Sequence, residues 1–473
     1  MSDRAMRADV LRLDTLVDGQ RFRPINIAWV VLAVLAMASD GYDLASLGYI
    51  APELLKQWHL PPTALVPAFS AGIIGMMIGG PVMGLLGDRY GRKPMIIVGL
   101  ATIGILNFVT TQVGSVGQLV VLRFCTGLMV GGVFPNVGSL IAEITPRRIR
   151  GRVMVIVSLG VALGIAQPGL VTRTLVPIYG WHAILVVGGS VLLAVAVAVA
   201  LVMPESIKYL VERGDDGERA RRLARRLRPD LAIGEDSRFA IPTAAGPSPA
   251  RGSMRPLFAG AFALVTPMLW ICQAANQMAN FFSLTWLPTL LQAAGASTAS
   301  AGASASLFSI GGLAAGVLLL LVIDRLGVVP LVAMFFVGAP LVAAIAMTSL
   351  PPAVHDLVIA GAGFCVTGVQ LGLTALLGLL YPTAIRSSGT GWTQAAGRLG
   401  ALAAPLVGAL LLSLHIPISE LPLAPAALLL VGGVACIVLT AACRRQFGSF
   451  RVAEFPIAES ATDVPLDPVA GTA

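Results

Sequence analysis

The chain has 473 residues, of which 56% are hydrophobic and 12% charged, and its formal net charge is +8. This composition excludes an ordinary soluble domain and indicates an integral membrane protein. The positive charge does not indicate a nucleic-acid partner, because no basic stripe is interleaved with aromatic residues. The cysteines show neither a disulfide framework nor the spacing of a metal site.

Apolar runs long enough to cross a bilayer as helices follow one another along the chain. They occupy roughly residues 25–48, 62–86, 95–112, 116–142, 152–172, 181–203, 257–290, 299–322, 328–348, 354–380, 389–413 and 422–443. We therefore expect an all-α polytopic membrane protein, with twelve transmembrane helices in two six-helix bundles.

Lysine and arginine gather on one side of these spans, while the other side holds only Lys56 and Arg173. Under the positive-inside rule, the first side is cytoplasmic and both termini lie there. The expected organisation is a tail at 1–24, a bundle at 25–203, a cytoplasmic linker at 204–256, a second bundle at 257–443 and a tail at 444–473.

Within the linker, the stretch from Glu218 to Leu227 predicts a short basic helix. Its arginines suit the anionic headgroups of a membrane surface. The alternative is a binding site for a regulatory partner.

The two halves of the chain repeat each other. Asp88-Arg89 after the second span returns as Asp324-Arg325 after the eighth, an offset of 324 − 88 = 236. The same offset relates Arg150 to Arg386 and Asp40 to Asn276. A constant offset indicates a six-plus-six duplication, which is typical of transporters with a binding site at the bilayer midplane.

The first span carries Asp40 and Asp43 near its centre, where each charge costs about 2.5 to 3.5 kcal/mol by insertion scales. Three residues apart, they share a helical face, as the carboxylates of a proton carrier would. The alternative is a pair that only hydrogen-bonds to neighbouring helices. We expect both acids to serve proton coupling.

Two arginines, Arg123 and Arg398, also fall inside spans. A guanidinium group matches a carboxylate with two parallel hydrogen bonds, so both are candidate substrate ligands. Each could instead neutralise Asp40 or Asp43. Gln394 lies one turn from Arg398 and adds a donor.

Further polar residues predict a substrate site in the second half. Asn276, Gln277 and Asn280 share a face of the seventh span, and Gln370 belongs to a polar stripe in the tenth. Amides suit a ring hydroxyl, and neighbouring aromatic residues suit a ring. Hydrogen bonding between helices is an equally good explanation of any one of them.

A charged loop joins the second and third spans, with glycines that permit a tight turn. We expect it to form a cytoplasmic gate that locks helices in one state. The expected gate residues are Gly84, Asp88, Arg89, Gly91, Arg92, Lys93, Glu143, Asp324, Arg325 and Arg386. In the second copy of the loop, Val328 and Val329 stand where the first copy has Arg92 and Lys93. We therefore expect a weaker latch, that is, a weaker charged gate, in the C-terminal half.

The loop from Gly84 to Lys93 resembles the signature loop of the major facilitator superfamily. Asp40-Gly41-Tyr42-Asp43 resembles a motif of its aromatic acid:proton symporters, as does the stretch from Tyr381 to Gly400. The resemblance runs from about residue 25 to 445 and implies the major facilitator fold. It also implies proton-coupled import of an aromatic carboxylate, such as 4-hydroxybenzoate, through a bacterial inner membrane.

By this resemblance, Asp40, Asp43, Arg123, Arg386 and Arg398 matter for transport, and Asp88 and Arg92 serve the loop. Tyr42 is expected to contact substrate. We expect a monomer with no cofactor, metal or enzymatic activity, whose partners are the aromatic carboxylate, protons and the lipid bilayer.

Three alternatives remain. The first is another branch of the superfamily, which would carry a sugar, a different organic anion or a drug. The second is a membrane-embedded enzyme, which the four scattered histidines do not favour. The third is a sensor without transport, which would usually carry an appended soluble domain.

Overall fold

The structure is a computed structural model that describes residues 10–20, 23–212, 217–231, 238–240, 255–260, 262–326, 328–347, 350–381 and 385–447. Long helices dominate this part of the chain. The first bundle contains α2 (Pro24–Gln57), η1 (Pro62–Leu65), α3 (Val66–Tyr90), α4 (Arg92–Thr110), α5 (Val116–Ile144), α6 (Arg147–Thr174), α7 (Val176–Tyr179) and α8 (His182–Val202).

A second bundle follows the linker. It contains η2 (Arg255–Phe258), α11 (Phe262–Ala293), α12 (Thr298–Leu326), α13 (Val329–Ala344), α14 (Pro352–Leu380), α15 (Arg386–Ser413), η3 (Ile418–Glu420) and α16 (Leu423–Phe447). Among the described residues, 10 helices are long and apolar enough to cross a membrane. Of the other two long helices, α13 has only 16 residues, and α11 has 32 residues that include several amides. The expected polytopic all-α fold is confirmed.

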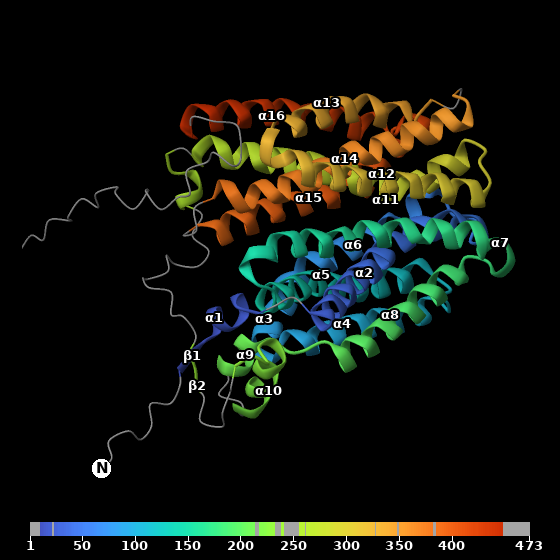
Figure 1. The fold of residues 1–473 in the computed structure, drawn as a ribbon. Coiled ribbons are helices and arrows are strands. Elements are labelled where there is room, and N and C mark those ends of the chain that lie inside the picture. Colours follow the sequence, from blue (N-terminus) through green and yellow to red (C-terminus); the bar gives the residue numbers. More distant parts are fainter. Residues whose placement is uncertain are drawn as a thin grey trace, which may run out of the picture.

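Helix packing repeats between the halves. In the first bundle α2 packs on α6, α3 on α5 and α4 on α8, and the same pairings recur as α11 with α15, α12 with α14 and α13 with α16. Adding 236 to the bounds of α5 gives 352 and 380, which are the bounds of α14. The two bundles lie side by side with their helices nearly parallel (Figure 1).

Residues at equivalent positions of the two halves contact each other between α2 and α11. Lys56 Nζ donates to Gln292 Oε1 at 2.7 Å, and these residues are 236 apart. Gly48 and Leu284 have the same spacing, and a Cβ built on Gly48 would lie 2.0 Å from the Leu284 carbonyl oxygen. Equivalent residues can touch only near the axis that relates the two halves, so this axis passes between α2 and α11.

Short elements form a cap at one end of the first bundle (Figure 1). The cap consists of β1 (Val10–Arg12), α1 (Leu13–Asp18), α9 (Ile207–Glu212), α10 (Gly217–Leu227) and β2 (Arg238–Ala240). The two strands pair in parallel, with Leu11 opposite Phe239. The basic helix expected between 218 and 227 is therefore present as α10.

Polar contacts fasten the cap to the loop between α5 and α6. Asp18 Oδ1 accepts from the Arg147 backbone N–H at 2.8 Å, and Gln20 Nε2 donates to the Ile144 carbonyl at 2.7 Å. Apolar residues of α1 and α10, such as Leu16 and Leu227, are buried against the bundle. The described parts of the chain before α2 and of the linker thus pack on the first bundle.

Among the described residues, hydrogen bonds join the two bundles most densely at the far end, opposite the cap. Thr298 Oγ1 donates to Glu53 Oε1 at 2.6 Å, and the hydroxyl groups of Tyr49 and Ser306 are 3.4 Å apart. Ser306 also donates to the Ala166 carbonyl at 2.8 Å. These contacts, together with Lys56 and Gln292, close the space between the bundles at this end.

Candidate functional site

The four residues Asp40 to Asp43 each face a different part of the structure. Successive residues of a helix point about a quarter-turn apart, so a four-residue stretch can serve four neighbours. Asp40 lines a cavity between the bundles, and Asp43 pairs with Arg123 of α5. A Cβ built on Gly41 would lie 2.2 Å from the Val161 carbonyl oxygen, so only glycine allows α2 to approach α6 this closely.

Tyr42 points to α8 rather than into the cavity. Its hydroxyl donates to the Ile184 carbonyl at 2.8 Å, and its ring lies against Gly188. The side chain is 4% exposed. In this structure, Tyr42 therefore fixes the rotation of α2, and with it the directions in which Asp40 and Asp43 point.

Asp43 and Arg123 form a buried ion pair beside a small cavity. Arg123 Nη1 lies 3.8 Å from Asp43 Oδ2, and Arg123 Nη2 donates to Ser46 Oγ at 3.3 Å. Both residues line a cavity of about 50 Å³, large enough for water. Among the described residues, Asp43 Oδ1 and Arg123 Nε are buried without a hydrogen-bond partner.

A larger cavity of about 250 Å³ lies between the bundles. Asp40 reaches it from α2, while Arg398 reaches it from α15 on the opposite wall. Asp40 Oδ1 has no hydrogen-bond partner within the described part of the chain. The cavity thus combines an acid from one bundle with a permanent cation from the other.

Arg398 also touches the first bundle. Its Nη1 donates to the Met76 carbonyl of α3, and its guanidinium group lies near Gly80, where an added Cβ would be 3.4 Å away. Because α3 and α15 belong to different bundles, this hydrogen bond of Arg398 depends on how the two bundles are placed relative to each other. A carboxylate that binds Arg398 would compete with the Met76 carbonyl for its N–H groups.

The amides predicted from the sequence divide into two sets. Gln277, Asn280, Gln370 and Gln394 line the larger cavity. Asn276 does not line it, but donates to Gln370 Oε1 at 3.0 Å, just as Gln273 donates to Gln394 Oε1 at 2.9 Å. Asn276 and Gln273 thus hold the side chains of Gln370 and Gln394 in place on the cavity wall.

The cavity lining also includes residues beyond the expected site. Thr367 and Thr374 belong to the polar stripe expected in the tenth span, and Phe281 is one of the aromatic residues that follow the amides of the seventh. Sequence reasoning missed Ser158, Ser309, Phe134 and Phe308, which also lie on the lining. Serines and phenylalanines are too common in membrane helices for their identity alone to predict a position on a cavity wall.

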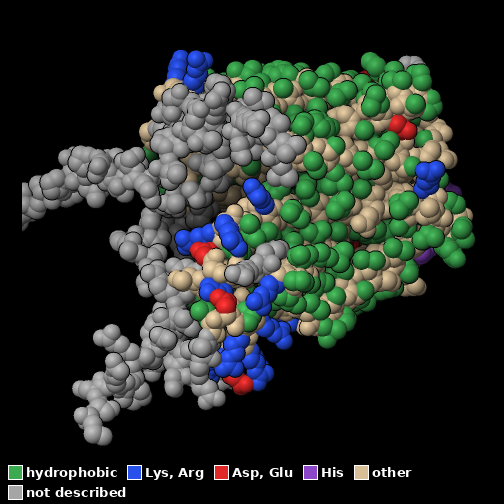
Figure 2. Space-filling model, viewed as in Figure 1, with side chains coloured by type: hydrophobic (Ala, Val, Ile, Leu, Met, Phe, Trp, Pro, Cys, Tyr) green, Lys and Arg blue, Asp and Glu red, His purple; other side chains and the backbone are tan. Residues whose placement is uncertain are grey.

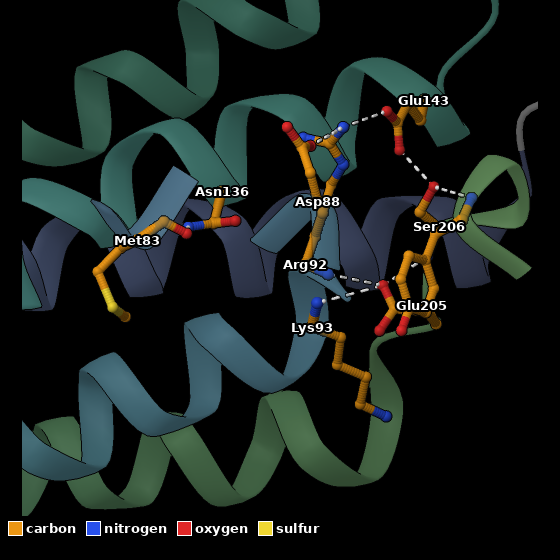
Figure 3. A network of polar contacts seen from close by, with 9 residues as sticks. Met83, Asp88, Arg92, Lys93, Asn136, Glu143, Glu205 and Ser206 are labelled. Atoms are coloured by element: carbon orange, nitrogen blue, oxygen red, sulfur yellow. Dashed lines mark hydrogen bonds and ion pairs between the residues drawn. The ribbon is translucent and has the colours of Figure 1, made fainter. Parts of the chain in front are cut away.

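The signature loop forms a charged network at the cap end of the first bundle (Figure 3). Arg92 Nη2 bridges Asp88 Oδ1 at 3.1 Å and Glu143 Oε1 at 2.9 Å. Ser206 Oγ donates to the other oxygen of Glu143. The network therefore joins α3, α4 and α5 to the chain just after α8.

Glu205 anchors this network and was not among the expected gate residues. Its Oε1 accepts from the backbone N–H groups of Arg92 at 3.1 Å, Lys93 at 3.2 Å and Ser206 at 2.8 Å. Burial raises the pKa of Glu205, and these N–H groups partly offset the rise. The sequence signal for Glu205 was its position as an acidic residue directly after the apolar span at 181–203.

Gly91 is required where α3 turns into α4. Its φ of 103° is a backbone conformation that residues with side chains rarely adopt. An added Cβ would also lie 2.5 Å from Glu205 Oε2. The glycine thus makes both the turn and the approach of Glu205 possible.

The remaining gate candidates have looser surroundings or lie outside the description. Arg89 is exposed and lies over the ring of Tyr90, and a Cβ on Gly84 would meet nothing within 4 Å. The side chains of Asp324, Arg325 and Arg386 lie outside the described residues, so the expected second latch stays a prediction. Within the described residues, no group of histidine, cysteine, aspartate or glutamate side chains could hold a metal ion.

Two repeated bundles around a polar cavity define a multi-pass membrane transporter rather than an enzyme. The sequence profile described as Major Facilitator Superfamily matches residues 33–405. The chain belongs to this superfamily, within the family of aromatic acid transporters.

Relatives of known function are similar over most of the chain. The 4-hydroxybenzoate transporter PcaK of Pseudomonas aeruginosa is 33% identical over 86% of this chain and 91% of its own length. The gallate transporter of Pseudomonas putida is 31% identical over 83% of this chain and 87% of its own. A solved structure of the proton:xylose symporter XylE has a TM-score of 0.62 at 18% identity, covering 91% of this chain and 98% of that one. This last similarity shows the fold alone.

Proposed function

We propose that the protein is a proton-coupled symporter that imports an aromatic monocarboxylate of the hydroxybenzoate or benzoate class by alternating access. The observation that carries the proposal is the cavity between the bundles, where Arg398 faces a lining that includes Asp40, amides and aromatic rings. A guanidinium group binds a carboxylate, rings bind a ring, and amides or hydroxyl groups bind ring hydroxyls. The aromatic acid transporters among its relatives support the same substrate class.

Proton coupling is assigned to the two aspartates. The substrate carboxylate binds Arg398, and Asp40 or Asp43 takes a proton, which removes a charge that would otherwise oppose closure of the cavity. Release of the substrate on the other side requires the proton to leave, so the movement of substrate and the movement of the proton are linked. Asp43 and Arg123 line a smaller cavity that adjoins the larger one, which gives the proton a site beside the substrate.

Sidedness follows from the distribution of lysine and arginine. The cap end carries most of these residues, so it lies in the cytoplasm together with both termini, and the membrane is a bacterial inner membrane. The bundles then meet tightly at the external end. One copy of the chain contains both halves of the cavity, so the transporter works as a monomer.

The proposal is tested with purified protein in liposomes. An inward pH gradient should drive accumulation of labelled 4-hydroxybenzoate, protocatechuate, benzoate or gentisate, and a protonophore should abolish it. Xylose and a non-aromatic dicarboxylate serve as controls for other branches of the superfamily. Accumulation of a control substrate with none of the four aromatic acids would overturn the substrate assignment, and aromatic accumulation that ignores the protonophore would overturn the coupling.

A further inference from the structure

One buried amide of the first bundle has no part in the transport mechanism described above. Asn107 lies on α4 and is 1% exposed. Within the part of the chain that the structure describes, neither its Nδ2 nor its Oδ1 has a hydrogen-bond partner. This amide calls for an explanation, because buried polar groups are normally hydrogen-bonded.

Helical spacing turns Asn107 toward the interior of the bundle. The buried residues of α4 recur every three or four positions, as expected for one helical face. They are Ile96, Gly99, Leu100, Ile103, Gly104, Asn107 and Thr110. Ile105 and Val109, on the other side of the helix, are 55% and 46% exposed. Away from the cap, hydrophobic side chains dominate the face of the bundles shown in Figure 2, and Asn107 is turned inward, as polar residues of membrane spans are.

Contacts with α8 place Asn107 at the depth of Asp43. The ring of Tyr42, which precedes Asp43 on α2, lies against Gly188 of α8. A Cβ added to the next residue of α8 would lie 3.0 Å from the ring of Phe108, which follows Asn107 on α4. Because neighbouring residues of α8 contact α2 and α4, Asp43 and Asn107 lie at a similar depth in the bundle.

Asn107 and Asp43 complement each other chemically. Asn107 is the neighbour that can donate a side-chain hydrogen bond to the Asp43 carboxylate. This bond is not closed in the structure, since Asp43 Oδ1 and the Asn107 amide are all buried without a partner among the described residues. Arg123 lies on the other side of the carboxylate, 3.8 Å from Oδ2. An amide offers N–H donors and a charged carboxylate only acceptors, so a closer approach satisfies a buried atom on each side.

We propose that Asn107 positions Asp43 for proton exchange by donating its amide N–H to Asp43 Oδ1 when the carboxylate is charged. The proposal rests on the coupling role assigned to Asp43 above. Arg123 then stabilises one oxygen of the carboxylate and Asn107 the other. A proton that binds Asp43 competes with both partners, so Asn107 favours release of the proton.

Few charged groups act on Asp43 within the described residues. Arg123 of α5 forms the ion pair, and Asp40 and Tyr42 on α2 also interact with it electrostatically. Of the other helices packed on α2, α11 carries no charged residue, and α4, α6 and α8 carry their charged or histidine residues at the helix ends. Loss of the amide should therefore be measurable as a shift in the titration of Asp43.

The test titrates Asp43 directly in the purified full-length protein, without substrate, by infrared difference spectroscopy. The carboxyl band that Asp43→Asn removes identifies this residue. Asn107→Leu and Asn107→Ala both remove the amide, the first with a side chain of similar shape and the second without added volume. Thr110→Val is the matched control, because Thr110 lies on the same buried face but donates to the Leu106 carbonyl of its own helix at 2.7 Å. The unfolding temperature of each variant checks that it is folded.

Both Asn107 variants should move the titration midpoint of Asp43 upward by about one pH unit. The carboxylate loses a charge-assisted hydrogen bond and should hold its proton about tenfold more tightly. Thr110→Val should leave the midpoint unchanged. An unchanged midpoint in the Asn107 variants would overturn the proposal, and so would an equal shift in the control, which would indicate altered packing of α4.

The pH dependence of uptake separates this inference from the proposed function. If Asp43 couples proton and substrate, the pH of half-maximal uptake should move upward with the titration midpoint. A shifted midpoint with an unchanged pH dependence of uptake would overturn the coupling role of Asp43 and leave the effect of Asn107 on Asp43 standing.

Discussion

At the scale of single residues, the two aspartates of α2 have different surroundings although they lie three residues apart. Asp40 faces the larger cavity, and Asp43 faces Arg123 and a cavity of its own. Removing one partner of a buried ion pair costs about 3 to 5 kcal/mol, because the other charge is left uncompensated. Any test of Asp43 must therefore separate lost coupling from lost folding.

Replacing Asp43 with asparagine should abolish uphill uptake, so that the accumulation ratio falls to about one, the value for an uncoupled carrier. Exchange of labelled for unlabelled substrate across the liposome should persist, because the larger cavity is intact. The double variant Asp43→Asn with Arg123→Gln removes both charges and controls for the unpaired arginine. Accumulation by either variant at the level of the parent would contradict a coupling role for Asp43.

At the scale of structural elements, the turn between α3 and α4 depends on an acid from a distant part of the chain. Glu205 follows α8 and accepts the N–H groups at the start of α4. The side chain of Arg92 continues the same network to Asp88 and Glu143. None of these residues lines the larger cavity, so the network can influence the rate of conformational change without touching a substrate bound there.

Replacing Glu205 with alanine should lower the maximal rate of uptake about tenfold and leave the KM for substrate nearly unchanged. A buried donor left without an acceptor costs about 1 to 3 kcal/mol, and three N–H groups would lose theirs. Glu205→Gln, which keeps an acceptor oxygen, is the matched control and should retain more activity. A large rise in KM with an unchanged maximal rate would show that Glu205 acts on binding instead.

At the scale of the whole molecule, the two bundles are joined by polar contacts at the end opposite the cap. Lys56 and Gln292 meet across the axis that relates the halves, and Glu53 contacts Thr298 nearby. In the proposed alternating-access cycle, opening of this end requires these contacts to break, and Arg398 must change its bond to Met76 as α3 and α15 move apart. Alternating access therefore predicts that fixing this end stops transport.

Cysteines at positions 56 and 292 should be joined by a short, reducible thiol cross-linker in the double variant Lys56→Cys with Gln292→Cys. Cross-linking should reduce uptake by about tenfold or more, because the closed end can no longer open. Treatment with a reducing agent should restore the rate. The two single variants, treated in the same way, control for modification alone, and full uptake by the cross-linked protein would contradict the proposed movement.

Much of this protein follows from its sequence, since a bilayer demands long apolar helices and disfavours buried charge. The duplication was visible in the offset between Asp88 and Asp324, and the contact of Lys56 with Gln292 has the same offset. Asp40, Gln277, Asn280, Gln370, Gln394 and Arg398 were predicted as polar residues within spans and share one cavity. A polar residue within a membrane span needs a compensating partner or a cavity, so the residue type alone is enough to predict that it has one.

Only the tertiary structure decided how these residues are divided. Helical spacing placed Asp40 and Asp43 on a common face, but the packing of α2 between α5, α6 and α8 sends them to separate cavities. It also directs Tyr42 to Ile184 and places Glu205 at the start of α4. Such contacts join residues more than a hundred positions apart, and their geometry depends on how helices approach one another, which no local pattern in the chain encodes.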